Sequence, residues 1–347
     1  MRVEEVTPGR RTPARLAGAI LTRDLQVGSH RWEKGRRLTA DDLVALASVE
    51  PAAPVTVLML EASELHEDDA ALRLAESVAG TGLDKRGPAQ SRVDLVAAAA
   101  GVVNVRIAEL ERVNRLDPLE VFTVFDGQVV ERGDLVASVK VAPHVVDAGI
   151  IDEAARLTAF GSTPLVWLAP FQRRRVGVVV KESVRATAKE RFEASVRAKV
   201  EGLGSTILDI LYVADDPEEV ETALRHFVRG ADTADLILTA GTASTDPNDA
   251  GFVAIAALGG RVVRRGVPAH PGSMLWLARI GATTVLGLPT CGAYSKATAA
   301  DLLLPRLLSG EPANEKTVAK LGYGGILTRS QRFRFPPYAR ELDAPDG

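Results

Sequence analysis

Apolar and polar residues in the second half of the chain alternate in blocks. Short and nearly continuous apolar runs are typical of strands that are covered on both faces, and they occur at residues 176–180, 207–213, 235–239, 262–264 and 283–288. Between these runs the apolar residues have helical spacing, at residues 184–203, 217–228, 247–258, 273–280 and 295–308. Alternation of this kind predicts βαβ units on a parallel sheet, and therefore an α/β domain with three αβα layers over residues 173–311.

The first half of the chain has a mixed pattern. Residues 40–47 read as a helix, for which Thr39 is a good N-cap, and residues 55–60 read as a strand. Residues 94–110 read as a helix followed by a strand or a second helix. Two β-rich runs within residues 121–141 flank Asp126-Gly127, which predicts a hairpin in a small β-rich element. The pattern therefore predicts an N-terminal α+β region over residues 1–172, and a C-terminal tail over residues 312–347.

Composition limits the class of protein. A chain of 347 residues is long enough for two or three domains, and a formal net charge of −3 gives no electrostatic reason to expect nucleic acid as a partner. Cys291 is the only cysteine, so no intrachain disulfide can form. No run approaches the length of a membrane span, and the first residues lack the apolar core of a signal peptide. We therefore expect a cytoplasmic protein with no membrane partner.

Three loops that follow predicted strands carry residues suited to binding. The first spans residues 239–249, where small residues and hydroxyl groups at Thr239, Gly241, Thr242 and Ser244 allow an anion such as phosphate to approach the backbone closely. Asp246 and Asp249 follow. Two carboxylates beside a phosphate generally need a cation between them, so we expect these residues to bind Mg²⁺ and to be catalytic. Alternatively, Asp246 only caps the next helix and Asp249 only stabilises its first turn.

The other two loops resemble the first in composition. The second, residues 266–274, contributes His270, Gly272 and Ser273 as candidate binding residues. The third, residues 287–295, contributes another set of mostly small residues, Pro289, Thr290, Gly292 and Ser295. Cys291 within it is either a nucleophile or a small residue that a tight loop tolerates. In open α/β sheets ligands bind beyond the carboxyl ends of the strands, so all three loops are expected to face one ligand.

Two further groups lie after the first two strands of the predicted sheet. Lys181, Glu182 and Ser183 follow the first strand, and this group either supplies Ser183 or Glu182 to the ligand or caps the next helix. Asp215 and Asp216 follow the second strand and have the same two interpretations.

The order of these loops resembles the molybdopterin-binding domain of molybdenum-cofactor biosynthesis proteins, which include molybdopterin adenylyltransferases and molybdotransferases. The family's Thr-x-Gly-Gly loop is similar to residues 239–242, and Asp246 and Asp249 lie downstream of it. Its Pro-Gly-Lys-Pro-like loop is similar to residues 270–273, and its Leu-Pro-Gly-Asn-Pro loop to residues 288–292. The chain departs from these motifs at Ala240, Ser273 and Cys291.

The resemblance implies a domain of molybdopterin-binding type that binds molybdopterin, or a related phosphorylated small molecule, together with Mg²⁺. It implies a homo-oligomer and, if the protein is an enzyme, a transferase of the molybdotransferase or adenylyltransferase type. Two other functions stay open at this point. One is a non-catalytic carrier or sensor of the cofactor, which the departures favour, and the other is a Mg²⁺-dependent nucleotide pyrophosphatase on the same domain.

Overall fold

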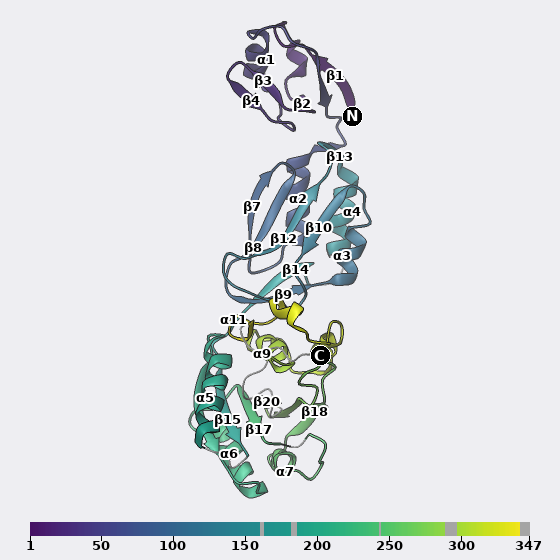
Figure 1. The fold of residues 1–347 in the computed structure, drawn as a ribbon. Coiled ribbons are helices and arrows are strands. Elements are labelled where there is room, and N and C mark those ends of the chain that lie inside the picture. Colours follow the sequence, from purple (N-terminus) through teal and green to yellow (C-terminus); the bar gives the residue numbers. More distant parts are fainter. Residues whose placement is uncertain (160–162, 182–185, 243, 289–296, 341–347) are drawn as a thin grey trace. The chain divides into compact units, whose positions relative to one another are not determined.

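The structure is a computed structural model that describes residues 1–159, 163–181, 186–242, 244–288 and 297–340 (Figure 1). The chain divides into two compact units. The first comprises residues 1–98, 104–126 and 132–168, and the second comprises residues 99–103, 127–131 and 169–347. The division predicted from the sequence is finer than this one and stays a prediction. Within the described residues, no helix combines the length and the apolar character that a bilayer span requires.

The first unit begins with a small antiparallel sheet around its own core. Its strands have the order β1-β5-β2, and a separate β3–β4 hairpin follows β2 along the chain. Thr39 caps α1 as predicted, because its hydroxyl accepts from the backbone N–H of Asp42 while the Asp42 carboxylate accepts from the backbone N–H of Thr39. The elements are β1 (Arg2–Val6), η1 (Ala14–Leu16), β2 (Ile20–Leu21), β3 (Leu25–Val27), β4 (His30–Trp32), α1 (Ala40–Ala47) and β5 (Val55–Met59).

The rest of the first unit contains a four-stranded antiparallel sheet in the order β10-β12-β8-β7, and β6 pairs with β13. The β-rich region predicted in the first half of the chain is therefore present. The elements of this stretch of the chain are β6 (Glu64–His66), α2 (Glu67–Val78), β7 (Leu83–Ala89), β8 (Arg92–Ala97), β9 (Gly101–Val105), α3 (Ile107–Val113), β10 (Leu119–Thr123), β11 (Val129–Val130), β12 (Leu135–Val141), β13 (Val145–Asp147), α4 (Ala148–Ala159) and β14 (Val166–Pro170). Of these, β11, most of β9 and the end of β14 belong to the second unit.

Two local predictions for this region are wrong in detail. Runs on either side of Asp126-Gly127 do pair, as β10 with β12, but they are not joined by a tight hairpin there, because β11, directly after the turn, pairs with β9. Residues 94–110 hold β8, β9 and only the start of α3, not a leading helix. The strand β9 pairs with β11 and β14, which are distant in sequence, and the local pattern contains no information about them.

The second unit is built on a six-stranded, mostly parallel sheet in the order β16-β15-β17-β20-β19-β18, of which Figure 1 labels β15, β17, β20 and β18. Only β19 runs against its neighbours, since it is antiparallel to both β20 and β18. The strands are β15 (Arg175–Val180), β16 (Thr206–Tyr212), β17 (Leu236–Ala240), β18 (Arg261–Arg265), β19 (Trp276–Ile280) and β20 (Thr283–Leu288). The predicted α/β class is therefore confirmed.

Helices cover both faces of this sheet and give the three predicted layers. One core lies between the sheet and α5 and α9, and the other lies between the sheet and α6 and α7. Alternate residues of β17 show the division, because Leu236 and Leu238 belong to the first core and Ile237 to the second. The helices are α5 (Ala186–Glu201), α6 (Pro217–Arg229), α7 (Ala250–Ala257) and α9 (Ala300–Leu308).

The prediction of a helix at residues 273–280 is wrong, because residues 276–280 form the strand β19. Leu275, Trp276, Leu277 and Ala278 are all at most 1% exposed, so no polar face exists along this segment. A short apolar run buried on both faces fits a central strand as well as it fits a buried helix. Its place between β18 and β20 determines which of the two forms.

The C-terminal segment packs on the same unit through α10 (Glu315–Ala319), η2 (Lys320–Gly322), η3 (Arg329–Arg334) and α11 (Pro337–Arg340). Tyr338 of α11 donates its hydroxyl hydrogen bond to Asp301 Oδ1 of α9 at 3.2 Å, and Lys199 of α5 forms an ion pair with the same carboxylate. The Lys199 Nζ also lies 5.4 Å from the centre of the Tyr338 ring. These three residues therefore join α5, α9 and α11 through one polar cluster, in which Lys199 and Asp301 are buried and Tyr338 is half-buried.

Burial, with the neighbouring charge of Asp301, raises the pKa of Tyr338 well above its ordinary value of 10.0. Because the pKa in the folded state is raised, this contribution to stability is present below about pH 10 and is lost as the pH rises beyond it. We expect wild type and Tyr338→Phe to give superimposable tyrosinate absorbance curves until the fold is lost. An additional tyrosinate in the wild type near pH 10, before unfolding, would contradict this assignment.

Candidate functional site

Strand register brings the ends of four strands to one edge of the six-stranded sheet. Val180 at the end of β15 lies opposite Ala240 at the end of β17, which lies opposite Leu288 at the end of β20. Arg265, the last residue of β18, lies opposite Trp276, where β19 begins next to β20. The loops that follow these strands therefore leave from the same edge, here called the carboxyl edge, as the sequence analysis expected of the three loops.

The loop after β17 combines a buried hydroxyl group with a backbone turn that suits glycine. Thr239 is 6% exposed, and its Oγ1 has no hydrogen-bond partner among the residues that the structure describes. Gly241 has a φ of +90°, which residues with a side chain rarely adopt. Thr242 and Ser244 are half-buried, and the Ser244 carbonyl accepts from the Arg265 guanidinium at 3.4 Å. The structure thus leaves a buried donor or acceptor unsatisfied next to a close-approach turn.

A buried lysine lies at the centre of the carboxyl edge. The Lys181 side chain is 5% exposed, and its Nζ lies 2.6 Å from Asp249 Oδ2 and 2.8 Å from Asp215 Oδ1. Burial lowers the pKa of Lys181, but hydrogen bonds to Asp215 and Asp249 outweigh it, so the pKa is raised above its ordinary value of 10.5. The side chain is therefore a cation, held by one buried carboxylate and by one, Asp215, that is 72% exposed.

The two acids predicted as catalytic and metal-binding occupy different environments. Asp249 is buried and is the N-cap of α7, where its Oδ1 accepts from the Gly251 N–H at 2.8 Å. Asp246 is exposed, and its Oδ1 accepts from the Asn248 N–H at 2.9 Å. The described residues contain no cluster of three His, Cys, Asp or Glu side chains that could hold a metal ion. Mg²⁺ binding and catalysis by these acids stay predictions.

The second predicted loop reaches the carboxyl edge beside the C-terminal segment. The His270 N–H donates to the Gly325 carbonyl and the His270 carbonyl accepts from the Leu327 N–H, both at 2.8 Å, while the imidazole is exposed. Gly272 is buried with a φ of +100°, and Ser273 is half-buried. The backbone of this loop is therefore anchored, and the His270 side chain has no structural role that the described contacts explain.

The third loop lies largely outside the described residues. Its four predicted binding residues, Pro289, Thr290, Gly292 and Ser295, belong to this part of the chain, as does Cys291. The structure describes the strand that leads to them, since Leu288 ends β20 at the carboxyl edge.

A small cavity of about 10 Å³ lies beneath the loop after β17. Lys181, Thr239 and Thr242 line it together with the bare Cα of Gly251 and the ring of Trp276. A side chain at Gly251 would come within 2.7 Å of the Thr242 Oγ1. The polar groups of three segments that are distant in sequence therefore meet beside one another at this edge.

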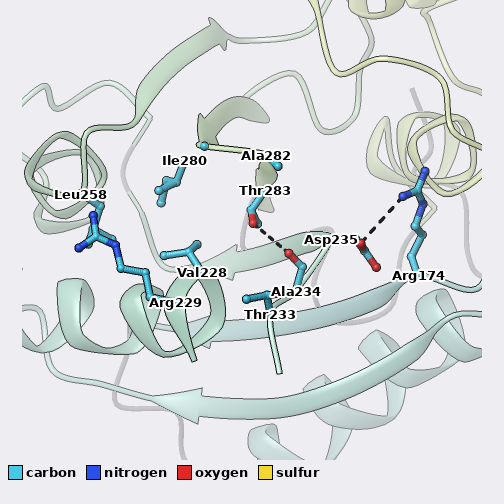
Figure 2. Close-up of a pocket in the computed structure, with 11 residues that line it drawn as sticks. Arg174, Val228, Arg229, Thr233, Ala234, Asp235, Leu258, Ile280, Ala282 and Thr283 are labelled. Carbon is cyan, nitrogen blue, oxygen red and sulfur yellow. Dashed lines mark hydrogen bonds and ion pairs between the residues drawn. The ribbon is translucent and has the colours of Figure 1, made fainter. Parts of the chain in front are cut away.

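A larger pocket, of about 460 Å³, lies elsewhere. Figure 2 shows it at the opposite edge of the sheet, near Asp235 before β17 and Thr283 at the start of β20. None of the predicted site residues lines it. This pocket and the candidate chemistry therefore lie at different edges, and the Thr239 hydroxyl and the Lys181 cluster favour the carboxyl edge as the predicted site.

The sequence family described as "Probable molybdopterin binding domain" matches residues 176–309. The matched segment contains all six strands of the second unit's sheet except the first residue of β15. The match confirms the resemblance inferred from the loops, and it places the carboxyl edge inside a molybdopterin-binding domain of molybdenum-cofactor biosynthesis. A comparison with curated proteins found no match.

Solved structures with similar domains are distant in sequence. The molybdopterin biosynthesis moea protein from Pyrococcus horikosii is 14% identical, with 72% of this chain and 81% of that chain covered and a TM-score of 0.30. A molybdenum cofactor biosynthesis protein B is 17% identical, with 44% of this chain and 93% of that chain covered and a TM-score of 0.28. Because both TM-scores are low, the description of the molybdopterin-binding domain depends on the family match and on the strand order.

Sequence reasoning did not identify Lys181 as the central charge of the site. It noted Lys181 and Asp215 only as residues that follow strands. The signal that could have found them was the strand order, because β15 lies between β16 and β17 and so brings their following residues together.

Proposed function

We propose that the carboxyl edge of the molybdopterin-binding domain binds the phosphate group of molybdopterin, or of a related phosphorylated pterin. Three features support this ligand: the cationic Lys181, the turn at Gly241 that permits close approach to the backbone, and the unpartnered hydroxyl of Thr239. The pterin itself would extend over the loops at residues 239–249 and 266–274, whose hydroxyl and backbone groups provide further donors.

The observation that carries the proposal is the asymmetry of the Lys181 ion pairs. Asp249 is buried and also caps α7, so it stays in place, whereas Asp215 is largely exposed and contributes little to stability. A phosphate oxygen can replace Asp215 at the Lys181 Nζ without leaving any buried charge unpaired. Binding therefore forms a charge-assisted hydrogen bond between Lys181 and the phosphate, and it breaks only the weak surface contact between Lys181 and Asp215.

Lys181 also helps to decide whether the domain holds the cofactor or transfers a group to it. Its ammonium group lies between two carboxylates, the position that a divalent cation would otherwise occupy. A fixed positive charge there makes phosphate binding independent of Mg²⁺. We infer a carrier or sensor function, in which the domain holds the cofactor and presents it to a partner.

A molybdotransferase or adenylyltransferase is the second candidate, and Asp246 favours it. This carboxylate is exposed in the loop after β17, forms no ion pair within the described part of the chain, and could hold Mg²⁺ against a bound phosphate. Group transfer to a phosphate needs such positioning and charge neutralisation. The homo-oligomeric state and the cytoplasmic location that the sequence implies also stay predictions.

Removal of metal separates the two functions. We expect purified protein to retain a pterin, identified by fluorescence and mass spectrometry, with an affinity that EDTA and Asp246→Asn change by less than about twofold, because Lys181 supplies the charge. Asp232→Asn, another exposed acid of this unit, is the matched control. Mg²⁺-dependent molybdate insertion or adenylyl transfer that Asp246→Asn abolishes and Asp232→Asn does not would overturn the carrier function in favour of the transferase.

A further inference from the structure

The edge of the sheet opposite the carboxyl edge has a pocket of its own. Its volume is about 460 Å³, which is within the range for small-molecule sites. A second pocket of about 280 Å³ adjoins it, because Arg174, Asp235 and Ala282 line both. This amino edge lies where β15, β17 and β20 begin, so it is distinct from the site proposed above.

Arginines from separate segments converge on the amino edge. Arg174 precedes β15 and Arg229 ends α6, and both line the larger pocket, whereas Arg279 of β19 lines the smaller one. Within the described part of the chain, Arg229 and Arg279 make no ion pair with a carboxylate, and Arg174 approaches Asp235 only to 3.9 Å. Asp235 is otherwise engaged, since its Oδ2 accepts from the Arg175 N–H at 2.8 Å. Positive charge therefore exceeds negative charge around the pocket.

Apolar side chains lie between the two arginines of the larger pocket, and Thr283 and Asp235 lie nearer to Arg174. Figure 2 shows Arg229 and Arg174 on opposite sides, with Val228 and Ile280 between them. Leu258 and Ile280 are almost fully buried in the core between the sheet and α6 and α7, so this surface is rigid. Thr283 also lines the pocket, and its hydroxyl group donates to the Ala234 carbonyl at 2.9 Å.

We propose that this pocket binds a small organic dianion, with an anionic group at each end and an apolar middle. One end pairs with Arg229, the other with Arg174, and the middle lies on the surface formed by Val228, Leu258 and Ile280. Guanidinium groups bind carboxylate and phosphate through two parallel hydrogen bonds, so either group fits the ends. Asp235 orients Arg174 from the side and leaves most of its donors free.

A structural role accounts for part of this arrangement and leaves the rest unexplained. Arg229 lies in the last turn of α6, where a cation is favourable beside the carbonyl ends of the helix. Arg174 belongs to no helix, and its guanidinium has no hydrogen bond within the described residues. Its position opposite Arg229, across a concave apolar surface, is what a two-ended anion requires.

Linear dicarboxylates test the proposal, because their length and charge can be varied separately. Binding of adipate and suberate to the full chain is measured by calorimetry at about 0.15 M salt, with hexanoate and octanoate as probes that lack one charge. We expect saturable binding that depends on chain length, and binding of each monocarboxylate that is roughly tenfold weaker. Arg174→Gln and Arg229→Gln should each weaken dicarboxylate binding by roughly tenfold or more.

Arg225→Gln is the matched control, since this arginine lies one turn earlier in α6 and already pairs with Glu221. It should change the affinity by less than about twofold. Circular dichroism of each variant establishes that the fold is retained. Absence of saturable binding up to about 10 mM for every dicarboxylate, or equal loss in the Arg225 and Arg229 variants, would overturn the proposal.

Discussion

Asp301→Ala is expected to destabilise the second unit by about 3–5 kcal/mol, the largest effect of any single substitution considered. The Asp301 side chain is 0% exposed and that of Lys199 is 2% exposed, so the substitution leaves a buried ammonium group without its anion. It also removes the acceptor for the Thr298 N–H, which donates to Asp301 Oδ2 at 2.8 Å, and for the Tyr338 hydroxyl. Thermal unfolding followed by calorimetry measures the loss as a lower Tm for this unit.

Two variants show whether the cost comes from the unpaired buried charge. Lys199→Met combined with Asp301→Asn removes both charges and keeps an acceptor for the Thr298 N–H, so it should recover most of the stability. Glu201→Gln breaks an exposed pair on the same helix, with Arg197 at 3.0 Å, and should cost less than about 1 kcal/mol. If the double variant is as unstable as Asp301→Ala, lost packing and not the lone charge is the cause.

This cluster could not be predicted from the sequence, whereas the layers around it could. The apolar run at residues 176–180 is covered on both faces, and its composition alone indicates a central strand. Lys199 and Asp301 are separated by about a hundred residues. In the sequence, each is an ordinary charged residue of a helix. Their pairing depends on how α5 and α9 pack, which is a property of the whole fold.

The same limit explains which parts of the candidate site were predicted. Thr239, Gly241 and Asp249 lie within one loop whose small residues and acids are visible as a local pattern, and the structure places them at the carboxyl edge. Lys181 is a single lysine after a strand, and a local pattern cannot show that it meets Asp249, 68 residues away. The misread strand at residues 276–280 has the same origin, because its form depends on the neighbouring strands.

Lys181→Met is expected to weaken pterin binding by roughly 10- to 100-fold, if the phosphate binds where we propose. The variant removes the buried positive charge and leaves Asp215 and Asp249 to repel the phosphate. Fluorescence of the bound pterin, titrated against wild type, measures the change. Lys181→Arg retains the charge and should recover part of the affinity, whereas Lys85→Met, at an exposed lysine of the first unit, should have no effect.

Stability has to be separated from binding in this experiment, because Lys181→Met leaves the Asp249 carboxylate buried without its cation. Lys181→Met combined with Asp249→Asn removes both charges, and asparagine retains the cap on α7. We expect this double variant to fold and still fail to bind the pterin. Since the pKa of Lys181 is raised in the folded state, the wild type should lose its stability advantage over the double variant only as the pH rises beyond about 10.5. A folded double variant with wild-type affinity would show that the phosphate binds elsewhere, and it would also remove the argument for a Mg²⁺-independent carrier, which depends on the same Lys181 charge.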